Sequence, residues 1–329
     1  MRLLTDHIYI INMEVKDVII IGGGPAGLNA AVVLGRCLRT VLVFDTAQYR
    51  NRWSHGMHNY LTRDHMHPSE FIKTAYEEIK KYGVLSSSKK IVHARRNSEG
   101  FFIVRDEEGT IYQSKKILVA TGLVDKVPKI EGFQEMYGKS VHHCPYCDGW
   151  EVRGRKLGVY ARDKDGSELA LALKGWTNEV TLYTDGKDKL KPEQKLSLSA
   201  NNIPVVKLSV ARLQGVEGQL EKIVFKDGQA HDCDSLFFVN GFEPQCDLAE
   251  TFGCNVTKKG VLIANRYQQT NIPGLYVAGD ATRDMHFVVV AAAEGAKAGV
   301  MINKELQKEI SEELLANSEI SKQQTAVMI

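Results

Sequence analysis

Long apolar runs and an excess of charge of one sign are both absent from this chain of 329 residues. No run approaches the roughly 18 apolar residues that a membrane-spanning helix needs. The 42 lysines and arginines nearly balance the 40 aspartates and glutamates. The resulting net charge of +2 provides no electrostatic footprint for nucleic acid or for an anionic membrane surface. We therefore expect neither nucleic acid nor a membrane as a partner.

Cysteine is also scarce, with six residues in the whole chain, and only Cys144 and Cys147 are closely spaced. So few cysteines argue against the disulfide scaffold of a small secreted domain. Residues Met1–Asn12 lack the small-residue cleavage site of a secretory signal. We expect a cytoplasmic protein with reduced structural thiols, in which residues 1–12 are an N-terminal extension and Met13 is a candidate start.

A strand–turn–helix–strand pattern lies near the start of the chain. The apolar, β-branched runs Asp17–Ile21 and Thr40–Phe44 are typical of buried parallel strands. Between them lie the turn Gly22-Gly23-Gly24-Pro25-Ala26-Gly27 and a helical stretch, Leu28–Arg36. Asp45 follows the second strand, about 20 residues after the first glycine, as in dinucleotide-binding units. The pattern predicts an α/β fold that begins with a βαβ unit.

The residue types in this turn suit a dinucleotide. Gly22, Gly24 and Gly27 permit a tight turn and a close approach of the backbone to a pyrophosphate. The helix N-terminus offers free N–H groups and the positive end of its dipole. Asp45 can accept hydrogen bonds from ribose hydroxyls. The motif alone does not distinguish FAD from NAD.

A second pattern of the same kind begins near Lys156, where strands Leu157–Tyr160 and Glu179–Tyr183 flank a helix at Ser167–Trp176. Its first two glycine positions are occupied by Ala161 and Asp163. Further strands are expected at Lys222–Phe225, Asp234–Val239, Leu262–Ala264 and Gly274–Gly279, and a final helix at Phe287–Glu305.

The segment His142-His143-Cys144-Pro145-Tyr146-Cys147-Asp148 carries the clearest chemistry. Two cysteines separated by two residues can close a small disulfide, and thiolates at a helix N-terminus exchange rapidly near neutral pH. Asp148 can move protons during thiol attack. Half of a zinc site is the alternative, but no second Cys-x-x-Cys is present and the two histidines are poorly spaced to complete it. His142 and His143 are either groups that tune the thiols or packing residues.

Taken together, these motifs resemble those of low-molecular-weight thioredoxin reductases over nearly the whole chain. The Cys-Pro-Tyr-Cys form is similar to a divergent branch with ferredoxin-dependent or diflavin reductases, related to fungal dithiol oxidases. The resemblance implies two doubly wound domains, with the FAD domain split around a central NADPH-domain-like domain. The expected divisions are an FAD domain at 13–127 and 243–316, a central domain at 128–242 that carries the cysteines, and a polar tail at 317–329.

The resemblance also implies site residues. Cys147 would face the flavin, Cys144 would exchange with the substrate, and Asp148 would be the acid/base. The residues implied to contact FAD are Gly22, Gly24, Pro25, Ala26, Gly27, Asp45, Arg50, Asn51, His58, Ala120, Thr121, Gly122, Gly279, Asp280, Met285, His286 and Phe287. A homodimer and a thioredoxin-like or small dithiol/disulfide partner are implied as well. No metal is expected.

NADPH is the doubtful cofactor. The reductases bind it through an intact glycine turn and a His-Arg-Arg run, whereas this chain has Asp163 in the turn and Thr184-Asp185-Gly186 after the next strand. Arg162 and Lys164 are the cations that could offset the carboxylate. We therefore expect thiol–disulfide exchange driven by another donor, either ferredoxin or a second flavin. The alternatives are a dithiol oxidase that uses oxygen and a redox-sensing flavoprotein without turnover.

Overall fold

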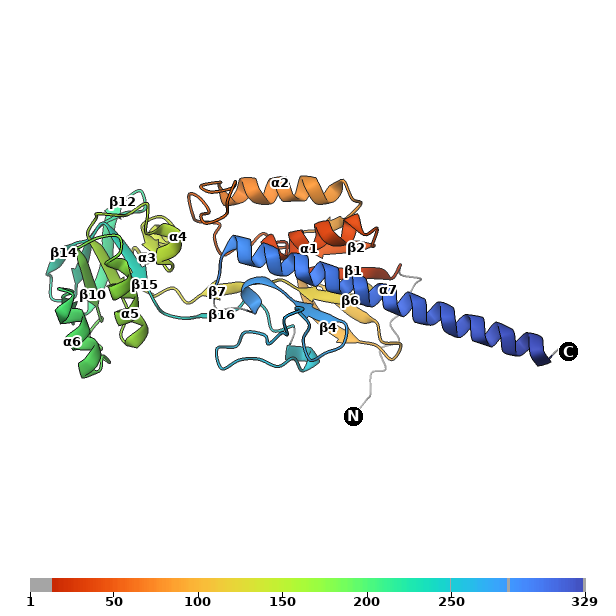
Figure 1. The fold of residues 1–329 in the computed structure, drawn as a ribbon. Helices are drawn as coiled ribbons and strands as arrows, with labels where there is room; N and C mark the ends of the chain where they lie inside the picture. Colours follow the sequence, from red (N-terminus) through yellow and green to blue (C-terminus); the bar gives the residue numbers. More distant parts are fainter. Residues whose placement is uncertain (1–13, 249, 283–284, 328–329) are drawn as a thin grey trace, which may run out of the picture. The chain divides into compact units, whose positions relative to one another are not determined.

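The computed structural model describes residues 14–248, 250–282 and 285–327, with side chains up to residue 320. The expected N-terminal extension and the candidate start at Met13 lie outside the described residues. The chain divides into two units: unit 1 comprises residues 1–49, 72–123 and 244–329, and unit 2 comprises residues 50–71 and 124–243. Figure 1 shows the elements of both units.

Unit 1 is built on a seven-stranded sheet with the strand order β3-β2-β1-β6-β5-β4. Strand β6 pairs along its length with β1 in parallel, while its other edge meets β5 antiparallel near its start and β17 in parallel near its end. The strands are β1 (Lys16–Ile21), β2 (Val41–Phe44), β3 (Leu85–Ser87), β4 (Ile91–Arg96), β5 (Phe102–Asp106), β6 (Ile111–Val119) and β17 (Leu275–Val277).

Both faces of this sheet are covered, as expected for strands that are apolar throughout. Val18 and Ile20 belong to the core that includes α1 (Pro25–Arg36) and α7 (Val288–Val327). Ile19 and Ile21 point to the opposite core, which includes Phe102. The remaining elements of unit 1 are α2 (Pro68–Lys80) and the short 3-10 helices η1 (Glu250–Phe252) and η2 (Gly279–Ala281).

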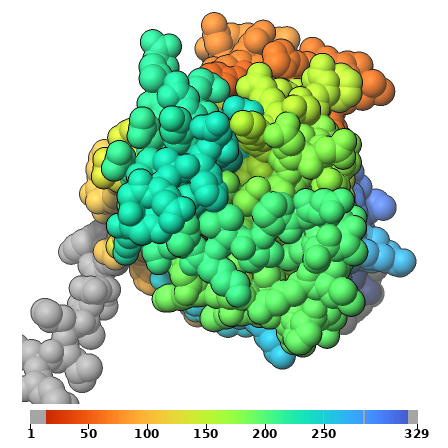
Figure 2. Space-filling model, turned by 90° about the vertical axis from the view of Figure 1, so that its left-hand side faces the viewer, coloured from red at the N-terminus to blue at the C-terminus, as the bar shows by residue number. Residues whose placement is uncertain are grey.

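Unit 2 is built on a parallel five-stranded sheet, β11-β10-β9-β15-β8, and an antiparallel sheet, β12-β13-β14. One face of this unit appears mainly in green and teal in Figure 2. The strands are β8 (Val141–His142), β9 (Leu157–Tyr160), β10 (Val180–Tyr183), β11 (Val205–Val206), β12 (Val210–Val216), β13 (Gln219–Phe225), β14 (Ala230–Asp232) and β15 (Ser235–Phe238). The helices are α3 (Phe133–Met136), α4 (Pro145–Asp148), α5 (Lys164–Leu173) and α6 (Pro192–Ala200).

The chain passes between the units at 49/50, 71/72, 123/124 and 243/244. The last two boundaries lie in strands that pair with each other, β7 (Leu123–Asp125) and β16 (Phe242–Pro244). The sequence placed the corresponding two divisions at 127/128 and 242/243. Residues 50–71 belong to unit 2, although the sequence assigned them to the FAD domain. The reason is local contact: Arg50 makes a bidentate ion pair with Asp125, and the Asn59 side-chain amide donates to the Tyr146 carbonyl at 2.8 Å.

The α/β class with doubly wound sheets is confirmed, and the strand predicted at Leu157–Tyr160 is observed with the same bounds. Two other expectations are wrong. Residues Leu262–Ala264 form no strand, because Leu262 makes only an isolated bridge to Val256. The last helix runs to Val327 rather than to Glu305, through residues expected to be a polar tail. These residues contain good helix formers such as Glu, Lys, Leu and Gln, so a polar sequence does not by itself end a helix.

Candidate active site

Three of the four glycines in the first glycine turn, in unit 1, are closely packed, and Gly24 is not. Gly22 has φ +109°, and a Cβ added there would lie 2.2 Å from the Ala120 carbonyl oxygen. A Cβ on Gly27 would lie 1.9 Å from the Gly22 carbonyl oxygen. A Cβ on Gly24 would meet no atom within 4 Å. Packing does not require glycine at this second motif position, whereas the close approach of a ligand would.

Helix α1 begins directly at this turn. Gly24 is its N-cap, Pro25 is its first residue, and no side chain caps the helix. Its first amides therefore lack a side-chain acceptor and, with the dipole, favour an anionic group at this end. This is the arrangement that a dinucleotide pyrophosphate requires.

Asp45 lies beside the turn, as the sequence predicted from its place after β2. A Cβ on Gly23 would be 2.6 Å from Asp45 Oδ2. The Tyr76 hydroxyl donates to Oδ2 at 2.8 Å, the Tyr49 hydroxyl donates to the same oxygen, and the Ala47 amide donates to Oδ1 at 3.1 Å. Since a carboxylate has roughly four acceptor sites, about one remains for a ribose hydroxyl. Burial and the carboxylate raise the pKa of both tyrosines, so the two hydroxyls stay protonated as donors.

The carboxyl edge of the same sheet brings the other expected flavin residues of unit 1 together. The Ala120 amide bonds to the Ile21 carbonyl at 2.8 Å, and the Ala278 amide bonds to the Val119 carbonyl at 3.1 Å. Ala120-Thr121-Gly122 and Gly279-Asp280 therefore follow neighbouring strands. The segment Met285–Phe287 leads from there into α7, and Met285 is exposed.

A buried glutamate, which the sequence did not single out, supports this edge. The Glu294 carboxylate on α7 accepts hydrogen bonds from the Gly279 amide at 2.9 Å and from the Thr282 hydroxyl at 3.0 Å. Only 5% of Glu294 is exposed. Gly295, next in the chain, lets α7 approach α1, because a Cβ there would lie 2.0 Å from the Ala26 carbonyl oxygen. A glutamate followed by a glycine within an otherwise apolar helical stretch was the sequence feature that could have pointed to this buried carboxylate.

The cysteine pair lies in unit 2, on the short helix α4. Cys144 is the N-cap, and its carbonyl accepts the amides of Cys147 and Asp148, both at 3.2 Å. Both thiols are free and half-buried. The hydrogen bond from the Cys147 thiol lowers the pKa of Cys144, whereas the same bond and burial raise the pKa of Cys147. A lowered pKa favours the thiolate, which is the form of a cysteine that attacks a disulfide.

Asp148 and His142 form a pair beside the thiols. His142 Nδ1 lies 3.3 Å from Asp148 Oδ1, and the histidine ring is buried. Burial acts to raise the pKa of Asp148, but the charge and hydrogen bond of His142, together with His143, bring it below its ordinary value. At neutral pH Asp148 is thus a carboxylate, which can take a proton from a neighbouring thiol.

A second charged cluster holds the chain just before the cysteines. Asp125 accepts from Arg50 and, at 2.5 Å, from the Tyr137 hydroxyl, and lies 3.9 Å from His143 Nδ1. Burial opposes ionisation of Asp125, but Arg50, His143 and Tyr137 lower its pKa to about 2. Burial and Arg50 lower the pKa of His143 to about 4, so its ring is neutral at neutral pH. No sequence pattern pointed to Asp125 or Tyr137, because the partners are distant in the chain.

The turn after β9 differs from the turn after β1. Asp163 caps α5 in an extended conformation, with φ −142°. Gly166 occupies the third glycine position, and a Cβ there would lie 2.4 Å from the Ala161 Cβ. The glycine that helix–strand packing needs is therefore present, and the glycines that a phosphate needs are replaced.

The cations near this second turn already have partners. Arg162 Nη2 lies 2.5 Å from Asp185 Oδ2, and Lys164 Nζ lies 3.1 Å from Glu168 Oε1. Asp185 also accepts from the Tyr160 hydroxyl at 2.8 Å and from the Val210 amide at 2.9 Å. The two cations that could offset Asp163 are thus directed to other carboxylates.

The geometry therefore brings most of the predicted residues into two groups. Gly22–Gly27, Asp45, Ala120–Gly122, Gly279 and Asp280 share one sheet edge of unit 1, and Cys144, Cys147 and Asp148 share one helix of unit 2. Arg50, Asn51 and His58 lie in unit 2, so their contacts with FAD remain predictions. A dinucleotide cradle in one unit and a dithiol in the other define a dinucleotide-dependent thiol–disulfide oxidoreductase.

Comparison with known proteins agrees with this class. Residues 16–295 match the family described as pyridine nucleotide-disulphide oxidoreductase. The chain is 31% identical over 312 residues to thioredoxin reductase tcpT of Claviceps purpurea, covering 91% of this chain and 96% of that protein. The crystal structure of TrxB from Bacillus anthracis is 33% identical with a TM-score of 0.85, over 89% of this chain and 99% of that one. The crystal structure of HlmI is 31% identical with a TM-score of 0.89, over 93% and 97%.

The chain belongs to the pyridine nucleotide-disulphide oxidoreductase family. It is an FAD-dependent disulfide oxidoreductase of the thioredoxin reductase type. The first turn fits FAD, because Gly24, the uncapped α1 and Asp45 supply what a dinucleotide requires. When bound, FAD supplies two-electron redox chemistry for exchange with a dithiol. Among the helices of the described residues, none combines the length and apolar character needed to cross a membrane.

Proposed function

We propose that this protein passes electrons between FAD and the Cys144–Cys147 disulfide, and that its electron donor is ferredoxin or a second flavin rather than NADPH. The observation that carries the proposal is the second turn. Asp163 stands at the N-terminus of α5, and the guanidinium of Arg162 is paired with Asp185.

Electrostatics disfavours a dinucleotide at this turn. A pyrophosphate at the start of α5 would meet the Asp163 carboxylate, and two anions in contact repel unless a cation lies between them. Moving Arg162 toward the pyrophosphate would leave the half-buried Asp185 without its ion-pair partner. The segment Thr184-Asp185-Gly186 after β10 also lacks an arginine fork for a 2′-phosphate.

Thiol–disulfide exchange follows from the two thiol environments. The Cys144 thiolate attacks a substrate disulfide, which forms a mixed disulfide and releases one substrate thiolate. Cys147 then attacks Cys144 Sγ, which closes the internal disulfide and releases the second substrate thiolate. Cys147 must lose its proton in this step, and in this proposal the neighbouring Asp148 carboxylate accepts it. Across the whole exchange the substrate disulfide is broken and the Cys144–Cys147 disulfide is formed, so two electrons pass from the protein to the substrate.

A thioredoxin-like protein is the partner that we propose. The curated relative of Claviceps purpurea is named a thioredoxin reductase. Tyr146 and Trp150 flank the dithiol and are 64% and 65% exposed. Exposed aromatic side chains beside a reactive site are typical of protein-binding surfaces. The homodimer implied by the family is a separate proposal, which light scattering of the purified protein tests.

Anaerobic reduction of the bound flavin tests the donor. NADPH, NADH, reduced ferredoxin and a dithiol are each added to the purified holoprotein, and the visible flavin band is followed. We expect rapid bleaching with reduced ferredoxin and little with either nucleotide at millimolar concentration. Rapid and complete bleaching by NADPH would overturn the proposed donor and leave the family assignment intact.

The same experiment separates the alternatives. Bleaching by a dithiol but not by ferredoxin, followed by peroxide formation on admission of oxygen, would identify a dithiol oxidase. Multiple turnovers with any disulfide or dithiol would exclude a sensor without turnover. The Cys144→Ser variant is the matched control, because it should lose reduction by the dithiol and retain the flavin.

A further inference from the structure

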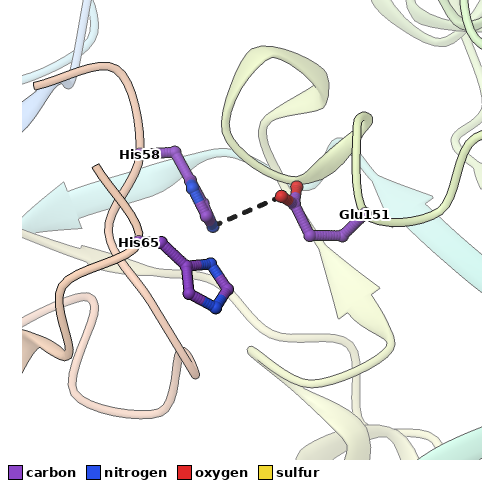
Figure 3. A group of neighbouring side chains, drawn as sticks. All are labelled: His58, His65 and Glu151. Atoms are coloured by element: carbon purple, nitrogen blue, oxygen red, sulfur yellow. Dashed lines mark ion pairs between the residues drawn. The ribbon is translucent and has the colours of Figure 1, made fainter. Parts of the chain in front are cut away.

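Two histidines and a glutamate converge on the surface of unit 2, outside the dithiol. His58 and His65 lie on the loop of residues 57–66, and Glu151 follows helix α4 (Figure 3). One ligand atom from each residue lies within 4.8 Å of the other two. His58 Nε2 is 3.7 Å from Glu151 Oε1, and the two imidazole ring centroids are 5.3 Å apart.

This donor set matches a known kind of metal coordination. Two imidazoles and one carboxylate are a ligand set that zinc uses in sites that keep one position open. Bonds of about 2.0–2.1 Å place tetrahedral ligand atoms about 3.4 Å apart. The His58–Glu151 separation is already close to that value, and the exposed side chains of His65 and Glu151 can move the remaining distance.

The environment of His58 supplies a second, separate indication. Its Nδ1 lies 3.7 Å from Asp64 Oδ1, on the opposite side of the ring from the nitrogen that faces Glu151. A metal-binding histidine usually directs its other ring nitrogen to a carboxylate or carbonyl, which orients the ring. Asp64 is itself held in place, because its Oδ1 accepts the Asn59 amide at 2.9 Å.

The backbone holds the two histidines next to each other. Met57 and Met66 form an isolated antiparallel bridge, and the His65 amide donates to the Met57 carbonyl at 2.8 Å. The loop is also tied to helix α4, since the Asn59 side-chain amide donates to the Tyr146 carbonyl. A metal bound by His58, His65 and Glu151 would therefore be a second connection between this loop and the region of helix α4, in addition to the Asn59–Tyr146 hydrogen bond.

We propose that His58, His65 and Glu151 bind one Zn²⁺ ion, which links the loop of residues 57–66 to the segment that follows the dithiol helix. The proposal is independent of the electron donor. It also gives His58 a role other than the flavin contact that the family implies. His65 and Glu151 are not among the implied flavin contacts, so their variants test the metal site alone.

The dithiol is a competing zinc ligand and must be removed from the test. Zinc binding is measured by calorimetric titration on the full-length Cys144→Ser/Cys147→Ser variant, with Co²⁺ absorption as the probe of coordination geometry. We expect one Zn²⁺ per chain with micromolar or tighter affinity, and a visible Co²⁺ spectrum typical of four-coordinate nitrogen and oxygen ligation.

Substitutions in the same background localise the site. His65→Ala and Glu151→Gln should each weaken binding at least tenfold and reduce the Co²⁺ absorption. His55→Ala is the matched control, an exposed histidine nearby in the chain, and should bind as the parent does. Absence of stoichiometric binding in the parent, or unchanged binding after His65→Ala, would overturn the proposal. Circular dichroism checks that each variant is folded.

Discussion

The two glycine-type turns of this protein have the same secondary structure but different residues at the positions that a dinucleotide would approach. Both follow a buried parallel strand, both begin a helix, and both have glycine at the third motif position, Gly27 in one and Gly166 in the other. In each case an added Cβ would collide with the preceding strand or turn, at 1.9 Å and 2.4 Å. Packing therefore maintains this glycine whether or not a nucleotide binds.

The turns differ at the first motif position, where Ala161 replaces glycine, and at the second, where packing around Gly24 imposes no constraint. Gly24 has open space around its missing side chain, whereas Asp163 occupies the corresponding position and carries a negative charge. If the proposed loss of the nucleotide is right, the second turn keeps the glycine that packing needs without the glycine that a phosphate needs. The comparison indicates that glycine at the third motif position is needed for packing, whereas glycine at the second position is needed only for a ligand.

The largest expected effect is a loss of disulfide exchange without a loss of the flavin. Cys144→Ser should reduce disulfide exchange by roughly 10³-fold or more, because it removes the nucleophilic sulfur. The flavin content should not change, since the cradle lies in unit 1. Steady-state turnover and the visible spectrum are the measurements. Residual turnover near that of the parent would mean that the cysteines are structural.

The second-largest effect is expected from a substitution that gives the first turn the aspartate found in the second turn. Gly24→Asp should weaken FAD binding by about 100-fold, or about 2.7 kcal/mol, because it places a carboxylate where the pyrophosphate approaches. Gly24→Ala is the matched control for bulk without charge and should have a smaller effect. Flavin content is measured by absorbance, and the apoprotein fold by circular dichroism. Full retention of FAD by Gly24→Asp would contradict the assignment of the cradle.

The reverse change gives the second turn the glycines of the first turn and tests whether they restore reduction by a nucleotide. Ala161→Gly/Asp163→Gly should increase the rate of flavin reduction by NADPH or NADH at least tenfold, because it restores the close approach and removes a carboxylate. Asp163→Asn keeps the side-chain size and tests the charge alone. Stopped-flow bleaching under anaerobic conditions measures the rate. An unchanged rate in both variants would place the obstacle at Asp185 rather than in the turn.

The smallest expected effect concerns the thiols. The Cys147 thiol donates to Cys144 and lowers its pKa, so the Cys144 thiolate persists at a pH where an ordinary cysteine, with a pKa of about 8.5, is protonated. Alkylation of reduced protein should accordingly slow only as the pH falls below that value. Cys147→Ala should move the midpoint upward by removing the donor, as iodoacetamide labelling against pH would show. A midpoint unchanged by this substitution would assign the low pKa to the backbone amides.

Local patterns were sufficient where the physical signal is local. The apolar runs around β1, β2 and β9 predicted those strands to within one residue at each end. The spacing of Gly22, Gly24 and Asp45 predicted the turn before α1 and the position of Asp45 beside it. The helical stretch expected from Ser167 begins three residues earlier in α5, which makes Asp163 its N-cap. The chain after residue 260 was harder, because Leu262–Ala264 looks apolar but has no neighbouring strand with which to form a ladder.

The sequence by itself determined the class of this protein, because a glycine turn, a strand-terminal acid and a Cys-x-x-Cys pair are short motifs whose chemistry depends on residue type and spacing. Only the tertiary structure decided which charges face each other. Arg162 is adjacent in sequence to Asp163 but pairs with Asp185, and Arg50 pairs with Asp125, 75 residues away. Likewise His58 and His65 meet Glu151 through the loop fold. Side-chain pairing between distant segments depends on how strands and loops are brought together, and no local pattern records it.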